Sequence, residues 1–188
     1  MGCGDGVYFS VPSIAAMVRR NTQWKIRCID IDEGAVKICQ DRIEKANLGA
    51  IVSAAPLDLR EISEKFDVVL FMESFPVIER NLMHELVVHA SKLAPEVQMY
   101  HNLVQKSTFL LSFIKPRIKY LTLVDFGKLT TCDEMEGICT QWGFQHTIEP
   151  LLTCTYGEMN PLMSFLPVSK SKITQYLVTL DCKKISKQ

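Results

Sequence analysis

The sequence has no pair of cysteines spaced as Cys-x-x-Cys, although it contains seven cysteines in 188 residues. An odd number of cysteines without such pairs argues against a disulfide framework and against a zinc ribbon. No apolar run approaches the ~20 residues of a membrane-spanning helix. We expect no signal peptide, because a glycine-rich motif begins at Gly2. These absences predict a cytoplasmic protein with reduced, mostly buried thiols and no bound metal.

Net charge is also absent, since 21 basic residues balance 21 acidic ones. Duplex nucleic acid binds basic surfaces, so this balance gives no support for a nucleic-acid partner. Hydrophobic residues make up 47% of the chain and charged residues 22%, which is usual for a globular protein. We expect one domain over residues 1–188 with a real hydrophobic core.

Helical and strand patterns alternate along the chain, which predicts a mostly parallel sheet with helices on both faces. The predicted helices cover 7–20, 33–46, 79–93 and 132–141, and the predicted strands cover 25–31, 50–55, 66–72 and 97–104. The strand 66–72 is almost continuously apolar, as is typical of a strand buried on both faces. Two last strands, 146–154 and 173–182, are expected to form an antiparallel hairpin at the sheet edge, joined by a loop over 156–172.

Glycine stands at alternate positions at the start of the chain, and this loop opens directly into the first predicted helix. The glycines are Gly2, Gly4 and Gly6. Glycine lets the backbone turn tightly and approach a ligand closely, and the helix start offers unpaired N–H groups. A dinucleotide-binding motif, G-x-G-x-x-G, would require glycine where Val7 stands. The pattern therefore disfavours an NAD-dependent dehydrogenase.

Acidic residues follow two of the predicted strands. Asp30 lies at the end of strand 25–31 and Asp32 directly follows the strand; an acidic residue there can accept hydrogen bonds from both ribose hydroxyls of a nucleoside. We favour Asp30 for this role and Asp32 as the cap of the next helix. Asp58 follows the next strand, where its carboxylate or neighbouring backbone would reach an adenine. A solvated or capping role for Asp58 is equally open.

The ordered set of motifs resembles class I, Rossmann-like S-adenosylmethionine-dependent methyltransferases over essentially the whole chain. The matching stretches are 1–6, 28–32, 57–59 and 66–74, together with the turn 142–144 before the edge hairpin. The resemblance implies an α/β fold and S-adenosylmethionine as cofactor. The implied cofactor-binding residues are Gly2, Gly4 and Gly6 around the methionine part, Asp30 at the ribose with Ile31 beside it, Asp58 and Leu59 at the adenine, and Met72.

The resemblance also implies methyl transfer to a small-molecule acceptor, with a hydrophobic or lipid-like compound as one option. The two candidate catalytic residues are Glu73, which follows the predicted strand 66–72, and His101, which lies in the predicted strand 97–104. Glu73 is preferred because it is expected at the mouth of the site, whereas His101 has an ordinary alternative as a hydrogen-bonded strand residue. Residues 105–130 are predicted to be an insertion on the acceptor side. Within it, 109–119 combine apolar and basic residues, as in a helix covering the core or in a contact with a membrane surface.

One feature departs from the family pattern at the start of the sequence. The family places a strand before the glycine loop, and this sequence begins at Met1. We expect a truncated sequence in preference to another segment that takes the place of the strand. The alternative hypothesis for function is a catalytically inactive, methyltransferase-like regulatory or partner subunit.

Overall fold

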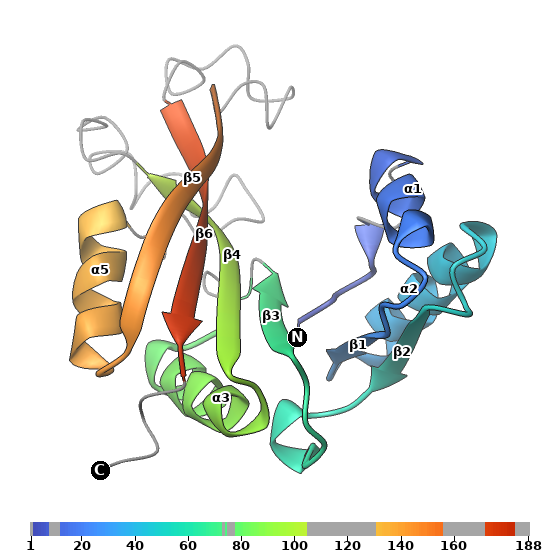
Figure 1. Cartoon of the computed structure of the whole chain (residues 1–188), viewed down its shortest axis with the longest axis horizontal. Coiled ribbons are helices and arrows are strands. Elements are labelled where there is room, and N and C mark those ends of the chain that lie inside the picture. The colour runs from blue at the N-terminus through green and yellow to red at the C-terminus, as the bar shows by residue number, and fades with distance from the viewer. Residues whose placement is uncertain are drawn as a thin grey trace. The chain divides into compact units, whose positions relative to one another are not determined.

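The computed structural model describes residues 2–7, 12–72, 74, 78–104, 131–155 and 172–182 (Figure 1). The chain divides into two compact units, Met1–Glu64 and Lys65–Gln188. The predicted insertion at 105–130, with its proposed membrane contact at 109–119, lies outside the described residues, and so does almost all of the loop 156–172. Among the described residues, no helix is long and apolar enough to cross a membrane.

The first unit is built around a parallel pair of strands joined by a helix. Its elements are α1 (Pro12–Arg20), β1 (Ile26–Asp30), α2 (Glu33–Lys45), β2 (Val52–Pro56) and the short 3-10 helix η2 (Leu59–Glu61). β1 and β2 run parallel, with Ile26 opposite Val52 and Asp30 opposite Pro56. The connection through α2 makes a β-α-β unit, so the carboxyl ends of both strands meet at the same edge.

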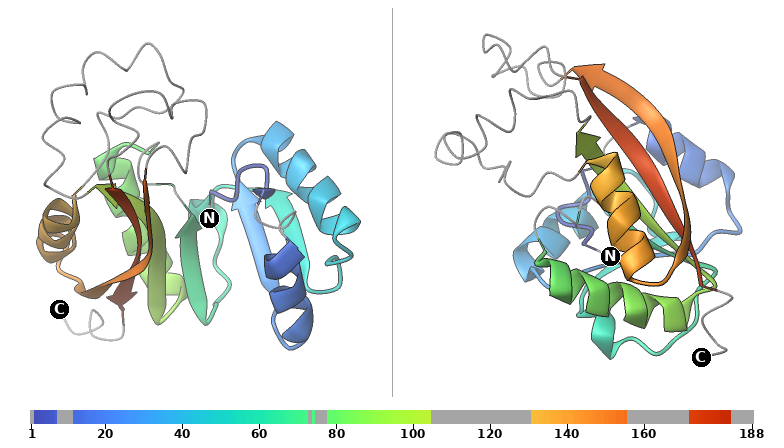
Figure 2. Two further views of the ribbon diagram at one scale, coloured as in Figure 1. Left: turned by 90° about the horizontal axis from the view of Figure 1, so that it is seen from above. Right: turned by 90° about the vertical axis from the view of Figure 1, so that its left-hand side faces the viewer.

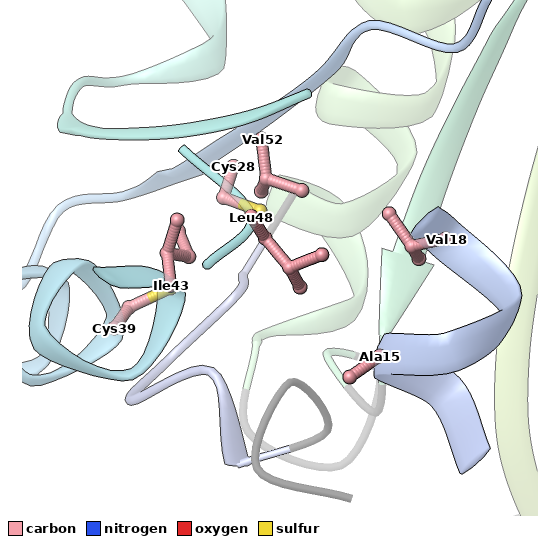
Figure 3. Packing of buried hydrophobic residues seen from close by; sticks show 7 residues of the cluster. All are labelled: Ala15, Val18, Cys28, Cys39, Ile43, Leu48 and Val52. Carbon is pink, nitrogen blue, oxygen red and sulfur yellow. The ribbon is translucent and has the colours of Figure 1, made fainter. Parts of the chain in front are cut away.

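The core of the first unit lies between the helices and the strand pair. Figure 3 shows side chains from α1, β1, α2, β2 and the turn after α2 gathered there, namely Ala15, Val18, Cys28, Cys39, Ile43, Leu48 and Val52. Not every apolar side chain of α2 faces this core, since Ile38 is 47% exposed. The buried side chains of this helix are Val36, Cys39 and Ile43.

Both ends of α2 are fixed by local hydrogen bonds that the sequence indicates. Asp32 caps the start, since its side chain accepts a hydrogen bond from the backbone N–H of Ala35 at 3.1 Å. After the end of the helix, Asn47 adopts a left-handed conformation with φ of 54°. The N–H of Leu48 then donates to the carbonyl of Ile43 at 3.0 Å, which closes a Schellman motif. The predicted capping role of Asp32 is therefore confirmed, and the left-handed residue Asn47 ends the helix.

The second unit holds a four-stranded sheet of order β3-β4-β6-β5. Its elements are β3 (Val68–Met72), α3 (Arg80–Leu93), β4 (Glu96–Val104), α5 (Cys132–Gln141), β5 (Gln145–Thr155) and β6 (Lys172–Asp181). β3 and β4 are parallel, whereas β6 runs antiparallel to both β4 and β5. The antiparallel hairpin β5-β6 confirms the prediction for the end of the chain. The α/β fold class with parallel strands and an antiparallel edge is confirmed as well.

β3 is not buried on both faces, contrary to the sequence prediction. Val69 and Phe71 are buried, but Val68 is 42% and Leu70 is 36% exposed. The ring of His84 on α3 stacks on Trp142 at the end of α5, with centroids 5.2 Å apart. The two helices thus pack together on one side of this sheet, as Figure 2 shows. Helices α3 and α5 bury one face of the sheet. An apolar strand sequence alone does not specify whether one or both faces of the strand are covered.

Helix α5 begins with a capping box, which makes its first turn a testable contribution to stability. Thr131 Oγ1 accepts from the N–H of Glu134 at 3.2 Å, and Glu134 Oε2 accepts from the N–H of Thr131 at 2.9 Å. We expect Thr131→Ala to lower the free energy of unfolding by about 1 kcal/mol, because the N–H of Glu134 loses its acceptor and the reciprocal capping box is broken. Urea unfolding followed by circular dichroism measures this. Thr140→Ala, an exposed change on the same helix, is the control and should have less than half that effect.

Candidate cofactor-binding site

The glycine loop at residues 2–6 adopts a backbone conformation that explains its alternating glycines. Gly2, Gly4 and Gly6 have φ angles of 63°, 50° and 64°. In this left-handed region, a side chain meets its own backbone at a cost of about 1–2 kcal/mol, which glycine avoids. The N–H of Gly6 donates to the carbonyl of Cys3 at 3.0 Å and closes the turn. Each glycine in the loop is therefore required by the backbone itself.

The loop is fastened to the carboxyl end of β1 by two hydrogen bonds. The N–H of Cys3 donates to the carbonyl of Ile29 at 3.2 Å. The N–H of Gly4 donates to Oδ2 of Asp30 at 2.9 Å. Two of the predicted site residues, 26 positions apart in sequence, are thus brought into direct contact.

Asp30 also forms a hydrogen bond outside the glycine loop. Its other oxygen, Oδ1, accepts from the N–H of Asp32 at 3.1 Å. Each carboxylate oxygen has two lone pairs, so a partly exposed Asp30 retains capacity for two further donors such as a pair of ribose hydroxyls. Asp32 is used as the cap of α2, which agrees with the division of roles between the two acids. Ile31 between them is 73% exposed.

Asp58 lies at the same edge of the strand pair, but its carboxylate already has a partner. The N–H of Leu57 donates to the carbonyl of Asp30 at 3.0 Å, which keeps the segment after β2 beside β1. Asp58 caps η2 by accepting from the N–H of Arg60 at 2.9 Å. Both of its carboxylate oxygens also accept from the Arg60 guanidinium, at distances from 2.5 to 3.1 Å. The capping role is thus observed, and a contact with adenine stays a prediction for Asp58 and for buried Leu59.

The other predicted site residues belong to the second unit. Met72 ends β3, where it pairs with Tyr100. His101 follows in β4 and pairs with Tyr176 of β6. The side chain of His101 and the whole of Glu73 lie outside the described residues. The proposed roles of these three residues therefore stay predictions.

Two residues of α2 contact the glycine loop, and sequence reasoning missed both. A Cβ atom added to Gly6 would lie 2.4 Å from Sγ of Cys39, so the loop backbone rests directly on that side chain. Arg42 donates through Nη1 to the carbonyl of Asp5 at 2.9 Å and to its Oδ2 at 2.7 Å. Cys39 and Arg42 are three positions apart and so share one face of the helix. The sequence does contain one indication: the small residue Cys39 lies between the apolar residues Val36 and Ile43 of this helix, where it leaves room for a backbone to approach closely.

The chain is similar to known proteins in structure, although no protein-family model and no curated protein matches its sequence. Solved structures do match. An O-methyltransferase family protein from Burkholderia thailandensis is 14% identical with a TM-score of 0.63, over 95% of this chain and 48% of that one. Geranyl diphosphate C-methyltransferase from Streptomyces coelicolor A3(2), solved with S-adenosyl-L-homocysteine, is 12% identical with a TM-score of 0.59, over 96% and 70%.

A third match is magnesium protoporphyrin IX methyltransferase from Synechocystis PCC 6803 with bound S-adenosylhomocysteine. It is 17% identical with a TM-score of 0.55, over 95% of this chain and 70% of that one. The chain thus spans about half the length of the Burkholderia protein and 70% of the other two. At these identities the shared property is the fold. The chain has the Rossmann-like α/β fold of class I S-adenosylmethionine-dependent methyltransferases.

Proposed function

We propose that this chain binds S-adenosylmethionine through the glycine loop and Asp30, and that it transfers the methyl group to a small-molecule acceptor. The observation that carries the proposal is the hydrogen bond from the N–H of Gly4 to Oδ2 of Asp30. It joins the loop proposed for the methionine part of the cofactor to the carboxylate proposed for the ribose. Both lie at the carboxyl end of β1, where open α/β sheets bind ligands.

The residues of the loop fit such a ligand. No described heavy atom lies within 4 Å of the position that a Cβ of Gly4 would take, so the space beside this backbone is open. A ligand can therefore approach the main chain at Gly4 as closely as glycine permits. Asp30 adds acceptor capacity for hydroxyl groups next to that space.

The contribution of the chain to the reaction is mainly orientation. When bound, S-adenosylmethionine supplies the sulfonium methyl group that the acceptor takes up. Holding two reactants in line accounts for much of the acceleration in such a transfer. Asp30 and the loop fix the cofactor in our proposal. Glu73, or else His101, acts as a base only if the acceptor must lose a proton.

The choice of a small-molecule acceptor draws support from the solved structures. Geranyl diphosphate and magnesium protoporphyrin IX are the compounds in the names of two of them, and both are small molecules that join an apolar body to charged groups. We therefore propose an acceptor of similar size with an apolar body. We also propose a cytoplasmic location, which suits the free thiols of the six cysteines whose side chains the structure describes.

Calorimetric titration of the chain with S-adenosylhomocysteine tests the cofactor assignment. We expect saturable binding, and we expect Gly4→Val to abolish it because the added side chain would occupy the open space beside the loop. Gly143→Val, at an exposed glycine that has a φ of +77° and also faces open space, is the matched control and should bind normally. Absence of binding by the folded chain would overturn the proposal.

A second experiment tests catalysis separately from binding. Labelled S-adenosylmethionine is incubated with the chain and with pooled metabolites, lipids or proteins, and transfer of label is measured. Transfer to a small molecule is the expected result. Binding of the cofactor without transfer to any pool would instead favour the inactive partner-subunit hypothesis.

Arg42 gives a graded test of the loop itself. We expect Arg42→Met to raise the dissociation constant for S-adenosylhomocysteine about 2–5-fold, because the loop loses its contact with α2 at Asp5. The effect is modest since both side chains are partly exposed and solvent screens the ion pair. Arg19→Met is the matched control: it removes an arginine that donates to the carbonyl of Ala46 at 2.8 Å, and affinity should not change. Equal effects of both variants would contradict a specific role for Arg42.

A further inference from the structure

A cluster of three cysteines lies behind the glycine loop. Cys3 belongs to the loop, Cys28 to β1 and Cys39 to α2. Cys28 and Cys39 are part of the core cluster in Figure 3, with exposed fractions of 7% and 0%, and Cys3 packs against that cluster. Cys3 itself is only half-buried. A dissolved reagent therefore reaches Cys3 before the other two.

The backbone holds Cys3 beside the end of β1, next to Cys28. The N–H of Cys3 donates to the carbonyl of Ile29, the residue that follows Cys28. The thiols of Cys3 and Cys28 interact through a hydrogen bond. A disulfide requires Cα atoms about 4.4–6.8 Å apart, so a bridge between these two residues fixes the loop against β1.

The same pair differs sharply in acidity. A hydrogen bond from the Cys28 thiol is the largest influence on Cys3 and lowers its pKa to about 7, although burial and the charge of Asp30 act in the opposite direction. That hydrogen bond, followed by burial, raises the pKa of Cys28 far above its ordinary value. Burial likewise raises the pKa of Cys39 to about 12. At neutral pH, Cys3 is therefore the member of the cluster with substantial thiolate, the nucleophilic form.

We propose that Cys3 and Cys28 form a peroxide-sensitive dithiol, in which Cys3 is the attacking sulfur and Cys28 resolves the intermediate. The Cys3 thiolate attacks hydrogen peroxide, a sulfur–oxygen bond forms, the oxygen–oxygen bond breaks, and the departing hydroxide takes a proton to become water. The Cys28 sulfur then attacks Cys3, the disulfide forms, and the oxygen leaves as a second water with the proton of Cys28. Two thiols are oxidised and one peroxide is reduced.

The disulfide would change the loop that binds the cofactor, and this part rests on the function proposed above. Two sulfurs in a disulfide are about 2.05 Å apart, much closer than hydrogen-bonded thiols. Bond formation therefore draws Cys3 toward β1 and displaces the adjoining Gly4, whose N–H contacts Asp30. We expect the oxidised chain to bind S-adenosylhomocysteine at least about tenfold more weakly than the reduced chain, the effect of losing one good hydrogen bond.

Mass spectrometry of the full chain treated with hydrogen peroxide tests the dithiol directly. We expect a loss of about 2 Da, from two hydrogens, and a cross-linked peptide pair that contains Cys3 and Cys28. Cys28→Ala should abolish the bridge and leave a sulfenic acid on Cys3 that dimedone traps. Cys39→Ala, which truncates another cysteine of the same core, is the matched control and should still form the bridge. A bridge to Cys39, or peroxide modification of Cys132 before Cys3, would overturn the proposal.

The pH dependence of alkylation checks the assignment of the attacking sulfur without any cofactor. The rate of Cys3 modification by iodoacetamide should rise with a midpoint near pH 7, and Cys28→Ala should move that midpoint upward because the lowering hydrogen bond is lost. Titration with S-adenosylhomocysteine before and after oxidation then tests the coupling. A chain that forms the disulfide but never binds S-adenosylhomocysteine would disprove the proposed function, and the dithiol would stand on the mass measurement alone.

Discussion

Replacing Gly6 by alanine is expected to destabilise the chain by about 2–5 kcal/mol. The added Cβ would lie 2.4 Å from Sγ and 3.0 Å from Cβ of Cys39, far inside normal contact, on a backbone with φ of +64°. The estimate combines left-handed strain of about 1–2 kcal/mol with overpacking of about 1–3 kcal/mol. Chemical unfolding followed by circular dichroism measures the change.

Gly4→Ala separates the two components of this prediction. Gly4 has a similar φ of +50°, but an added Cβ there meets no described atom within 4 Å. This variant should therefore show the strain without the clash, about 1–2 kcal/mol. The double variant Gly6→Ala/Cys39→Ala should have a free energy of unfolding about 1 kcal/mol higher than Gly6→Ala alone, because the nearest clashing atom, Sγ of Cys39, is removed. If Gly6→Ala were no worse than Gly4→Ala, the close packing of the loop on α2 would be wrong.

Replacing Asp30 by asparagine is expected to raise the dissociation constant for S-adenosylhomocysteine about 10–100-fold. Hydrogen bonds to a charged acceptor contribute about 1.5–3 kcal/mol, and asparagine removes the charge. The two carboxylate oxygens also accept from the N–H groups of Gly4 and Asp32. An amide in their place must turn its NH2 group toward one of these donors, so the loop loses a fastening point as well. Calorimetry gives the affinity, and circular dichroism confirms folding.

Asp32→Asn is the matched control for Asp30→Asn. It removes the same charge two residues away, and asparagine caps a helix about as well as aspartate does. The bond from the N–H of Ala35 can therefore be retained, and affinity should stay within about twofold. A similar loss of affinity in both variants would show that net charge matters and not a contact made by Asp30.

The features that sequence predicts well here are those set by a few neighbouring residues. Asp32 and Thr131 cap helices because a side-chain oxygen meets N–H groups three positions on. Asn47 ends α2, and Gly143, with φ of 77°, ends α5, each through a left-handed residue. The direct contact of Gly4 with Asp30 agrees with the ordered motifs, which assign the glycine loop and the end of the strand 25–31 to one cofactor site.

Features that depend on packing between elements escaped the sequence. Cys39 and Arg42 look like ordinary helix positions, and only the fold places them against the glycine loop. The sequence likewise does not indicate that the guanidinium of Arg60 forms an ion pair with Asp58. The partial exposure of Val68 on β3 depends on where helices lie, which an apolar strand pattern does not encode. The glycine loop and the helix caps can therefore be predicted from neighbouring residues, whereas the residues that pack against them depend on the tertiary structure.

The fastening of the loop to β1 and α2 has a consequence for dynamics. The described polar contacts of the loop come from Ile29, Asp30 and Arg42, all within the first compact unit. A transient opening of this unit alone would then release the loop, even while the second unit stays folded. Ligand affinity would be set partly by the free energy of that sub-global opening, and a bound ligand would slow hydrogen exchange throughout β1 and α2. Surface substitutions far from the ligand but within this unit would in that case change affinity through local stability.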